Sequence, residues 1–256
     1  MQKSKSTALA AIIHDPEGNM LPAIERIAEP FAAMFGGLVM SLTDTSAGAM
    51  KPLLEKQLGA KVLTHPTGDQ FIGLARRNVV IHANGFDQAL YCDFDHVLRW
   101  LEAAPEDLQR TLDQQPETDL LIVGRTHEAL HRGPARLRQT ETIVNHIFEL
   151  ATGLDWDLLF SIRRLSPTAI DLIAKKASVN TIGTDMEWPM LARAAGLKLG
   201  YLASDALDYR TIEEFDSEAD TGDSDPMQWI RRMELVSEEA AVLKSFLTGH
   251  RSFDVR

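Results

Sequence analysis

The sequence contains one cysteine, Cys92, and no apolar run that approaches the length of a membrane-spanning helix. A single cysteine cannot form an intramolecular disulfide, which favours a reducing compartment. A helix that crosses a bilayer needs about 20 consecutive apolar residues, so we predict no transmembrane segment. The apolar segment at residues 8–13 is too short for a secretory signal peptide and lacks a cleavage site. We therefore expect a cytoplasmic protein.

Basic residues are scarce relative to acidic ones. The chain has 26 Lys and Arg against 37 Asp and Glu, a formal net charge of -11, which argues against a surface that binds nucleic acid. The 256 residues are 45% hydrophobic and 25% charged, which is ordinary globular composition and enough chain to bury a full core. Internal repeats are lacking, and we expect the acidic stretch at residues 213–220 to be mobile.

Apolar segments alternate with amphipathic ones along the first hundred residues. Short apolar runs with flanking turn residues predict strands at residues 7–14, 37–43 and 61–64, and a fourth that starts at residue 89. Apolar residues at helical spacing predict helices at residues 21–35, 49–58 and 70–83. Strands and helices in this order predict a mostly parallel sheet with right-handed crossovers.

The fourth predicted strand ends in an Asp-x-Asp pair, Asp93 and Asp95. Ligands of open α/β sheets bind at the carboxyl ends of the strands. Two neighbouring carboxylates there can hold Mg²⁺ or Mn²⁺ against the diphosphate of a nucleotide. The alternative is that the pair caps the following helix, which suits Asp95 well and Asp93 poorly.

A basic segment follows the predicted strand at residues 120–125. Its members are Arg125, His127, His131, Arg132, Arg136 and Arg138. Arginine suits bidentate contacts with phosphate, so the segment predicts a phosphate site for a leaving diphosphate or a phosphorylated acceptor. The alternative is a solvated loop that balances Glu128 and Glu141.

Asp185, Glu187 and Trp188 lie in the first turns of a helix predicted to start near residue 184. Acidic residues at a helix N-terminus are favoured by the helix dipole for structural reasons alone. Trp188 is as compatible with the core as with stacking on a sugar or an acceptor.

The order of these motifs resembles the GT-A-fold glycosyltransferases, and among them the dolichyl-phosphate mannose synthase-like enzymes of the family 2 type. The resemblance extends over residues 8–210. It is carried by Asp44 after the second strand, the helix start at residues 68–78, the Asp-x-Asp pair, residues 120–125, and Asp185 with Glu187.

The resemblance implies an α/β fold, GT-A and Rossmann-like, with a mixed, mostly parallel sheet flanked by helices. It implies that Asp93 and Asp95 hold Mn²⁺ or Mg²⁺, that Asp185 is a general base, and that Glu187 accompanies it in catalysis. Nucleotide-binding residues implied in the same way are Asp44, Gly68, Arg77 and Asp93. The residues implied for phosphate or acceptor binding are Arg125, Arg136, Arg138 and Trp188.

The sequence also departs from that family. The Pro-x-x-Asn-Glu loop that usually follows the first strand is replaced by residues 14–19, His-Asp-Pro-Glu-Gly-Asn, so we expect the base to be held differently. We predict a catalytic domain at residues 1–210. An acidic loop and an amphipathic C-terminal helix, residues 211–256, are appended to it, and the helix offers a surface for a homo-oligomer.

The sequence hypothesis is therefore a hexosyltransferase-like, metal-dependent glycosyltransferase that uses a UDP- or GDP-sugar, with inversion, and an acceptor left unidentified. One alternative is a catalytically silent GT-A-like binding domain, which the altered first loop favours and the retained Asp93 and Asp95 oppose. Another is a nucleotidyltransferase that makes sugar nucleotides. Its glycine-rich phosphate loop is missing, because only Gly18 follows the first strand closely.

Overall fold

The structure is a computed structural model that describes residues 7–207 and 221–249. The predicted boundary at residue 210 and the acidic stretch at residues 213–220 lie outside the described residues. No helix among the described residues is both long enough and apolar enough to cross a bilayer.

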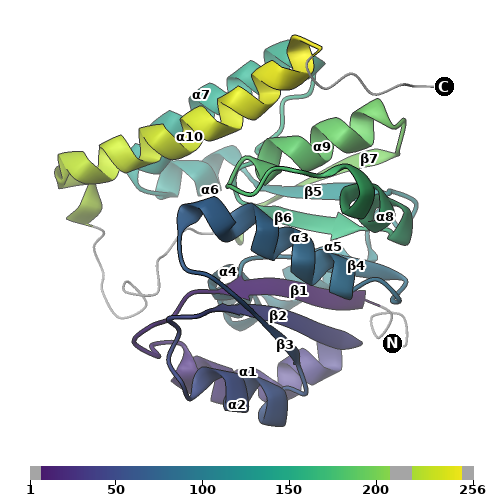
Figure 1. The fold of residues 1–256 in the computed structure, drawn as a ribbon, viewed down its shortest axis with the longest axis vertical. Coiled ribbons are helices and arrows are strands. Elements are labelled where there is room, and N and C mark those ends of the chain that lie inside the picture. Colours follow the sequence, from purple (N-terminus) through teal and green to yellow (C-terminus); the bar gives the residue numbers. More distant parts are fainter. Residues whose placement is uncertain (1–6, 208–220, 250–256) are drawn as a thin grey trace.

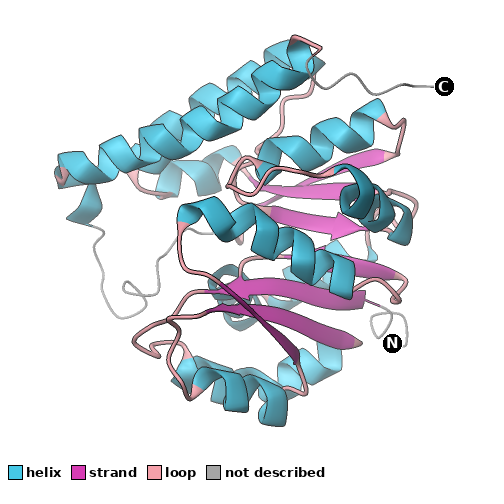
Figure 2. Ribbon diagram, in the orientation of Figure 1, coloured by secondary structure: helices cyan, strands magenta, loops and turns pink. Residues whose placement is uncertain are grey.

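One sheet forms the centre of the molecule, with helices on both sides of it (Figure 2). It has seven strands in the order β3-β2-β1-β4-β6-β5-β7. β6 runs antiparallel to β4 and β5, and the other neighbours are parallel. This confirms the predicted mixed, mostly parallel sheet. The strands are β1 (Thr7–Ile13), β2 (Gly37–Thr43), β3 (Lys61–His65), β4 (Gln88–Tyr91), β5 (Leu120–Arg125), β6 (Ile162–Leu165) and β7 (Leu199–Ser204).

Helices cover both faces of the sheet (Figure 1). They are α1 (Leu21–Met34), α2 (Met50–Gln57), α3 (Ile72–His82), α4 (Phe94–Ala103), α5 (Pro105–Asp113), α6 (His127–Arg132), α7 (Ala135–Thr152), α8 (Pro167–Lys176), α9 (Thr184–Ala194) and α10 (Pro226–Leu247). Two short 3₁₀ helices are η2 (Asp69–Phe71) and η4 (Thr221–Ser224). The predicted helix at residues 70–83 is thus divided between η2 and α3.

Alternate residues of β1 enter two separate cores, as the period of a strand requires. Leu9, Ala11 and Ile13 pack with α1, α2, α4 and α5 on one face. Ala8 and Ala10 pack with α3, α8 and α9 on the other. Because both faces are covered, the strand reads as a continuous apolar run rather than an alternating one.

α10 lies beside α7 and also packs against α9 (Figure 1). Val236 and Leu243 of α10 enter a third apolar cluster with Val144 and Phe148 of α7. The C-terminal helix is therefore part of the same packed body as the sheet, and its first turns lie near the carboxyl ends of the strands.

Candidate active site

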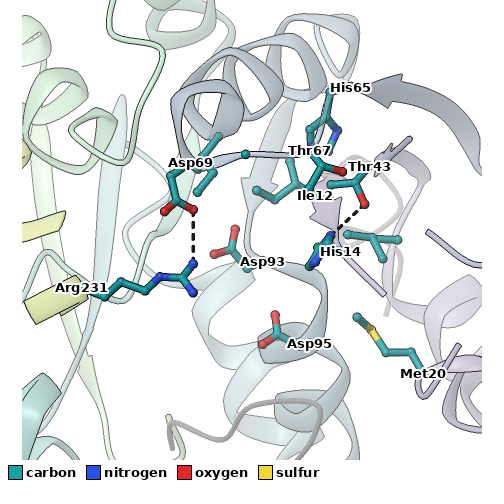
Figure 3. A pocket seen from close by; sticks show the side chains of 13 residues that line it. Ile12, His14, Met20, Thr43, His65, Thr67, Asp69, Asp93, Asp95 and Arg231 are labelled. Atoms are coloured by element: carbon teal, nitrogen blue, oxygen red, sulfur yellow. Dashed lines mark hydrogen bonds and ion pairs between the residues drawn. The ribbon is translucent and has the colours of Figure 1, made fainter. Parts of the chain in front are cut away.

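A pocket of about 450 Å³ opens at the carboxyl ends of the first four strands. Its lining comes from β1 to β3, the connections that follow the first four strands, α3, α4 and α10 (Figure 3). The described lining residues are Ile12, Ile13, His14, Met20, Thr43, His65, Thr67, Gly68, Asp69, Ile72, Asp93, Asp95 and Arg231. Its position is the one where open α/β sheets bind ligands.

Asp93 follows β4 and precedes α4, but its side chain makes no capping hydrogen bond. One carboxylate oxygen, Oδ1, accepts a short hydrogen bond from the hydroxyl of Tyr91. The other, Oδ2, accepts from Arg76 Nη2 at 3.2 Å. Burial raises the pKa of Tyr91 well above its ordinary value, so its hydroxyl stays protonated and remains a donor. These contacts fix the Asp93 carboxylate at the pocket, and the capping alternative is wrong for it.

Asp95 lies in the first turn of α4, and its side chain is 25% exposed. Burial raises the pKa of its carboxyl above the ordinary value. The ring Nε2 of His96 lies 3.7 Å from Asp95 Oδ2. Asp93 and Asp95 face the same pocket, as the sequence predicted, although Asp93 lies between β4 and α4 and Asp95 lies within α4 (Figure 3).

Arg76 of α3 links Asp93 to Asp185. Its guanidinium lies 3.2 Å from Asp93 Oδ2 and 3.1 Å from Asp185 Oδ2, and its side chain is 4% exposed. Burial acts to lower the pKa of Arg76, but the carboxylates of Asp185 and Asp93 more than reverse this effect and raise the pKa well above its ordinary value. Arg76 is therefore a permanent buried cation that positions both carboxylates.

Asp185 begins α9 in the interior rather than in the pocket. Its Oδ2 accepts from Ser161 Oγ at 2.8 Å as well as from Arg76. Ser161 has a φ of 58°, an uncommon conformation for a residue other than glycine, and this conformation delivers its hydroxyl to Asp185. A general base must reach the proton that it removes, whereas Asp185 is 4% exposed and hydrogen-bonded on the side that faces Arg76.

Glu187 and Trp188, the other two residues predicted on this helix, are also buried. Glu187 is fully buried and accepts from the amides of Ser178 and Val179 at 2.8 Å and 3.1 Å, so it anchors the connection between α8 and α9. Trp188 is 2% exposed and packs edge-on against Tyr91, with ring centroids 5.8 Å apart. The structure places both outside the pocket lining, away from the catalytic role implied for Glu187 and the contact with sugar or acceptor implied for Trp188.

Asp44 and Gly68, two predicted nucleotide-binding residues, lie at or beside the pocket. Asp44 is exposed, and it accepts from the Thr67 hydroxyl at 2.8 Å and the Thr67 amide at 2.9 Å. These hydrogen bonds hold the pKa of Asp44 below its ordinary value. Gly68 has a φ of 132°, which favours glycine, and lines the pocket. Asp44 therefore fixes the loop whose residues Thr67 and Gly68 form one wall.

Arg77 does not reach the pocket. Its guanidinium donates to the carbonyl of Ala177 at 3.2 Å and to the side chain of Asn180 at 3.0 Å. Consecutive residues of an α-helix point about 100° apart, so the adjacent Arg76 takes the inward position that the sequence reasoning assigned to Arg77.

The three arginines of the basic segment that were predicted to bind phosphate are held by other groups of the protein. Arg125 is buried between Asp157, at 2.7 Å, and Glu141, at 2.6 Å. Arg136 pairs with Asp223 at 3.1 Å, and Arg138 donates to the carbonyl of His131 at 3.0 Å. In the described structure these three arginines line no part of the pocket. The ion pair of Arg125 with Glu141 holds α7 to the sheet, and that of Arg136 with Asp223 holds η4 to α7, which gives the two side chains a structural role.

The pocket also contains side chains that sequence reasoning did not select. His14 Nδ1 lies 3.0 Å from Thr43 Oγ1, and His65 Nδ1 lies 2.8 Å from Ser41 Oγ. Burial lowers the pKa of His65. Both histidines stand at strand ends, a signal visible in the sequence. Arg231, from the C-terminal helix, carries no such signal.

No family model matches the sequence, and no curated protein matches it. The fold is similar to that of glucosyl-3-phosphoglycerate synthase from M. tuberculosis, with a TM-score of 0.59 and 12% identity over 94% of this chain and 80% of that one. The same enzyme in complex with Mg²⁺ and uridine diphosphate gives a TM-score of 0.57 and 13% identity, over 94% and 78% of the two chains. A mycobacterial protein gives 0.60 and 13%, over 94% and 74%. At these identities the likeness shows the fold, and it confirms the predicted GT-A-like architecture.

Proposed function

We propose that this protein is a metal-dependent glycosyltransferase that moves a sugar from a nucleotide-diphosphate donor to an acceptor. The observation that carries the proposal is that Asp93 and Asp95 face one pocket at the carboxyl ends of the first four strands. The alternative of a nucleotidyltransferase that makes sugar nucleotides lacks the glycine-rich loop of that class, because His14 and residues 15–17 follow β1.

The residues at the pocket fit a divalent cation. Among the described residues, no three His, Cys, Asp or Glu side chains gather closely enough to hold a metal alone. Mg²⁺ is usually bound through one or two carboxylates, with substrate phosphates and water completing its shell. Asp93 and Asp95 match that need, and Mn²⁺ also accepts such oxygen ligands. A cation bound by them would neutralise charge on the departing diphosphate.

The other pocket residues supply binding and orientation. Tyr91 and Arg76 hold the Asp93 carboxylate in place from behind. His14, Thr43 and Thr67 present polar atoms at the β1 and β2 side of the pocket, where we place the base and ribose. In the GT-A enzymes that this sequence resembles, a Pro-x-x-Asn-Glu loop usually follows the first strand. In this chain the His14 imidazole occupies the start of that segment and faces the pocket.

The structural neighbours support a uridine nucleotide as donor. One, with a TM-score of 0.54, is glucosyl-3-phosphoglycerate synthase in complex with Mn²⁺, UDP-glucose and glycerol 3-phosphate. We therefore propose a UDP-sugar rather than a GDP-sugar. Inversion stays a prediction from the resemblance. The burial of Asp185 favours a positioning role for it, through Arg76, over the role of a base.

The proposal is tested by thermal shift and calorimetry with UDP- and GDP-sugars, with and without Mn²⁺. A ligand that binds only the folded state raises the melting temperature. We expect a Mn²⁺-dependent shift with a UDP-sugar that is lost in Asp93→Asn and in Asp95→Asn. Asp87→Asn is the matched control, because exposed Asp87 precedes the amino end of β4, opposite the pocket.

Two results would contradict the assignment: no shift with any nucleotide sugar, or full shifts in both pocket variants. Binding without release of UDP in the presence of candidate acceptors would support the silent binding domain. Formation of a sugar nucleotide from a sugar 1-phosphate and a nucleoside triphosphate would support the nucleotidyltransferase.

A further inference from the structure

The charged side chains that line the pocket are unequal in sign. Three are carboxylates, Asp69, Asp93 and Asp95, whereas Arg231 is the one lysine or arginine among the described lining residues. A diphosphate or phosphate group that enters this pocket meets strong repulsion unless cations accompany it. A metal at Asp93 and Asp95 would offset part of this charge, and Arg231 is the guanidinium available on the α10 side (Figure 3).

The packing of α10 determines where Arg231 points. One side of the helix is buried through Val236 and Leu243. Arg232, the residue after Arg231, pairs with Glu141 of α7 at 2.6 Å. Because consecutive residues point about 100° apart, Arg232 faces α7 while Arg231 faces the pocket. The helix packs against α7 and α9, so the backbone of Arg231 is held beside the pocket.

The present partner of Arg231 is weakly bound. Arg231 Nη2 lies 3.4 Å from Asp69 Oδ1, and the two side chains are 60% and 46% exposed. An ion pair this exposed contributes little to stability. By contrast, the buried Arg76 is engaged by two carboxylates. Arg231 can therefore exchange Asp69 for a phosphate, and its planar fork suits two parallel hydrogen bonds to phosphate oxygens.

We propose that Arg231 binds a phosphate group of the ligand, opposite the carboxylates of Asp93 and Asp95. The inference rests on the proposed function for the identity of the ligand but not for its phosphate chemistry. The phosphate belongs either to the nucleotide donor or to a phosphorylated acceptor. Asp69 competes with it for the guanidinium.

The experiment is calorimetry of the full chain with Mn²⁺ and four probes: UDP, uridine, inorganic pyrophosphate and glycerol 3-phosphate. We expect Arg231→Gln to weaken the binding of phosphate-containing probes by about 10- to 100-fold and to leave uridine unaffected. Arg231→Lys should recover part of the affinity, and Asp69→Asn should increase it. Arg26→Gln is the matched control, since Arg26 forms a similarly exposed ion pair with Glu102, at 3.0 Å, outside this pocket.

The probes distinguish a donor phosphate from an acceptor phosphate, and they test the role of Arg231 separately from the proposed function. A loss with UDP alone assigns Arg231 to the donor, and a loss with glycerol 3-phosphate alone assigns it to the acceptor; each supports the inference. If the wild type binds pyrophosphate but no nucleotide, the proposed function fails, and the pyrophosphate affinity of Arg231→Gln still decides the role of Arg231. Equal affinities of wild type and Arg231→Gln for every phosphate probe, or no binding of any such probe, overturn the inference.

Discussion

The guanidinium of Arg76 donates to the carboxylate of Asp93 at 3.2 Å from beneath the pocket. The same guanidinium bonds to Asp185, so a single buried cation connects α3 and α9 to the candidate metal ligand. Partners of metal-binding carboxylates orient them and affect metal affinity. If Asp93 binds the metal as proposed, this geometry makes Arg76 and Asp185 positioning residues.

Arg76→Lys should weaken Mn²⁺ binding by about 10- to 100-fold, the usual effect of removing a partner of a metal ligand. Lysine keeps the buried charge but cannot bridge Asp93 and Asp185 with a planar fork. Calorimetric titration of Mn²⁺ with UDP present measures the effect. Arg77→Lys is the control and should bind as the wild type does, because Arg77 bonds to the loop around Asn180. Similar losses in both variants would refute the distinction.

Local patterns in the sequence were sufficient for most of the fold. β2 and β5 coincide with the predicted residues 37–43 and 120–125, because continuous apolar runs bounded by glycine or polar residues identify buried strands. The position of Asp93 and Asp95, the candidate metal ligands, could be predicted from the sequence as well, since the end of a parallel strand marks the sheet edge where ligands bind.

Long-range pairing was not accessible from the sequence. β6 inserts between β4 and β5, an order that depends on contacts between distant segments. Arg125 was predicted to bind phosphate because it belongs to a basic segment of the sequence. Its actual partners, Glu141 and Asp157, are 16 and 32 residues away along the chain, so no local pattern indicated them. Arg231 was missed because only the folding of α10 beside the sheet brings it to the pocket.

Arg125→Met should lower the free energy of unfolding by about 3–5 kcal/mol, because it leaves the buried carboxylates of Asp157 and Glu141 without this partner. Urea denaturation measures the change. The folded fraction should bind a nucleotide sugar as the wild type does, since Arg125 lies outside the pocket lining.

The control for this prediction is Arg138→Met, which removes a hydrogen bond to the His131 carbonyl and should cost about 1 kcal/mol. An Arg125→Met protein of normal stability that has lost nucleotide affinity would restore the phosphate role predicted from the sequence.

The exposed large apolar side chains of the described residues all lie on α7 and α10. They are Ile143, Leu150, Met227, Ile230, Met233 and Leu247. The two helices pack against each other. Exposed apolar side chains that form a contiguous patch mark interaction surfaces, and we expect a second copy of the chain to cover them. Light scattering after size exclusion should give a dimer mass for the wild type.

The double variant Ile230→Glu with Met233→Glu should be monomeric in the same measurement, because it places charge in that interface. Gln57→Glu, which adds a carboxylate to the exposed face of α2, should stay dimeric. A wild type that is monomeric at every concentration would rule out the homo-oligomer.

Glu239 of α10 is 1% exposed, and its Oε2 has no hydrogen-bond partner among the described residues. Burial, followed by the charges of Asp185 and Glu141, raises the pKa of Glu239 well above its ordinary value of 4.5, although Arg232 and Arg76 oppose the shift. A carboxyl whose pKa is raised by folding stabilises the fold below its unfolded pKa. That stabilisation is lost as the pH rises toward the folded pKa.

Glu239→Gln has no proton to lose, so it should be more stable than the wild type at neutral pH. The difference in free energy of unfolding should be smallest near pH 4 and should grow by up to about 1.4 kcal/mol per pH unit above the ordinary pKa of glutamate. Urea denaturation at pH 4, 6 and 8 measures this difference. Glu234→Gln, an exposed position on the same helix, should show no such trend. Parallel pH profiles for Glu239→Gln and the wild type would contradict this prediction. They would mean that Glu239 has the same pKa in the folded and the unfolded chain, because Arg76 and Arg232 fully offset the effects of burial and of the neighbouring carboxylates on that pKa.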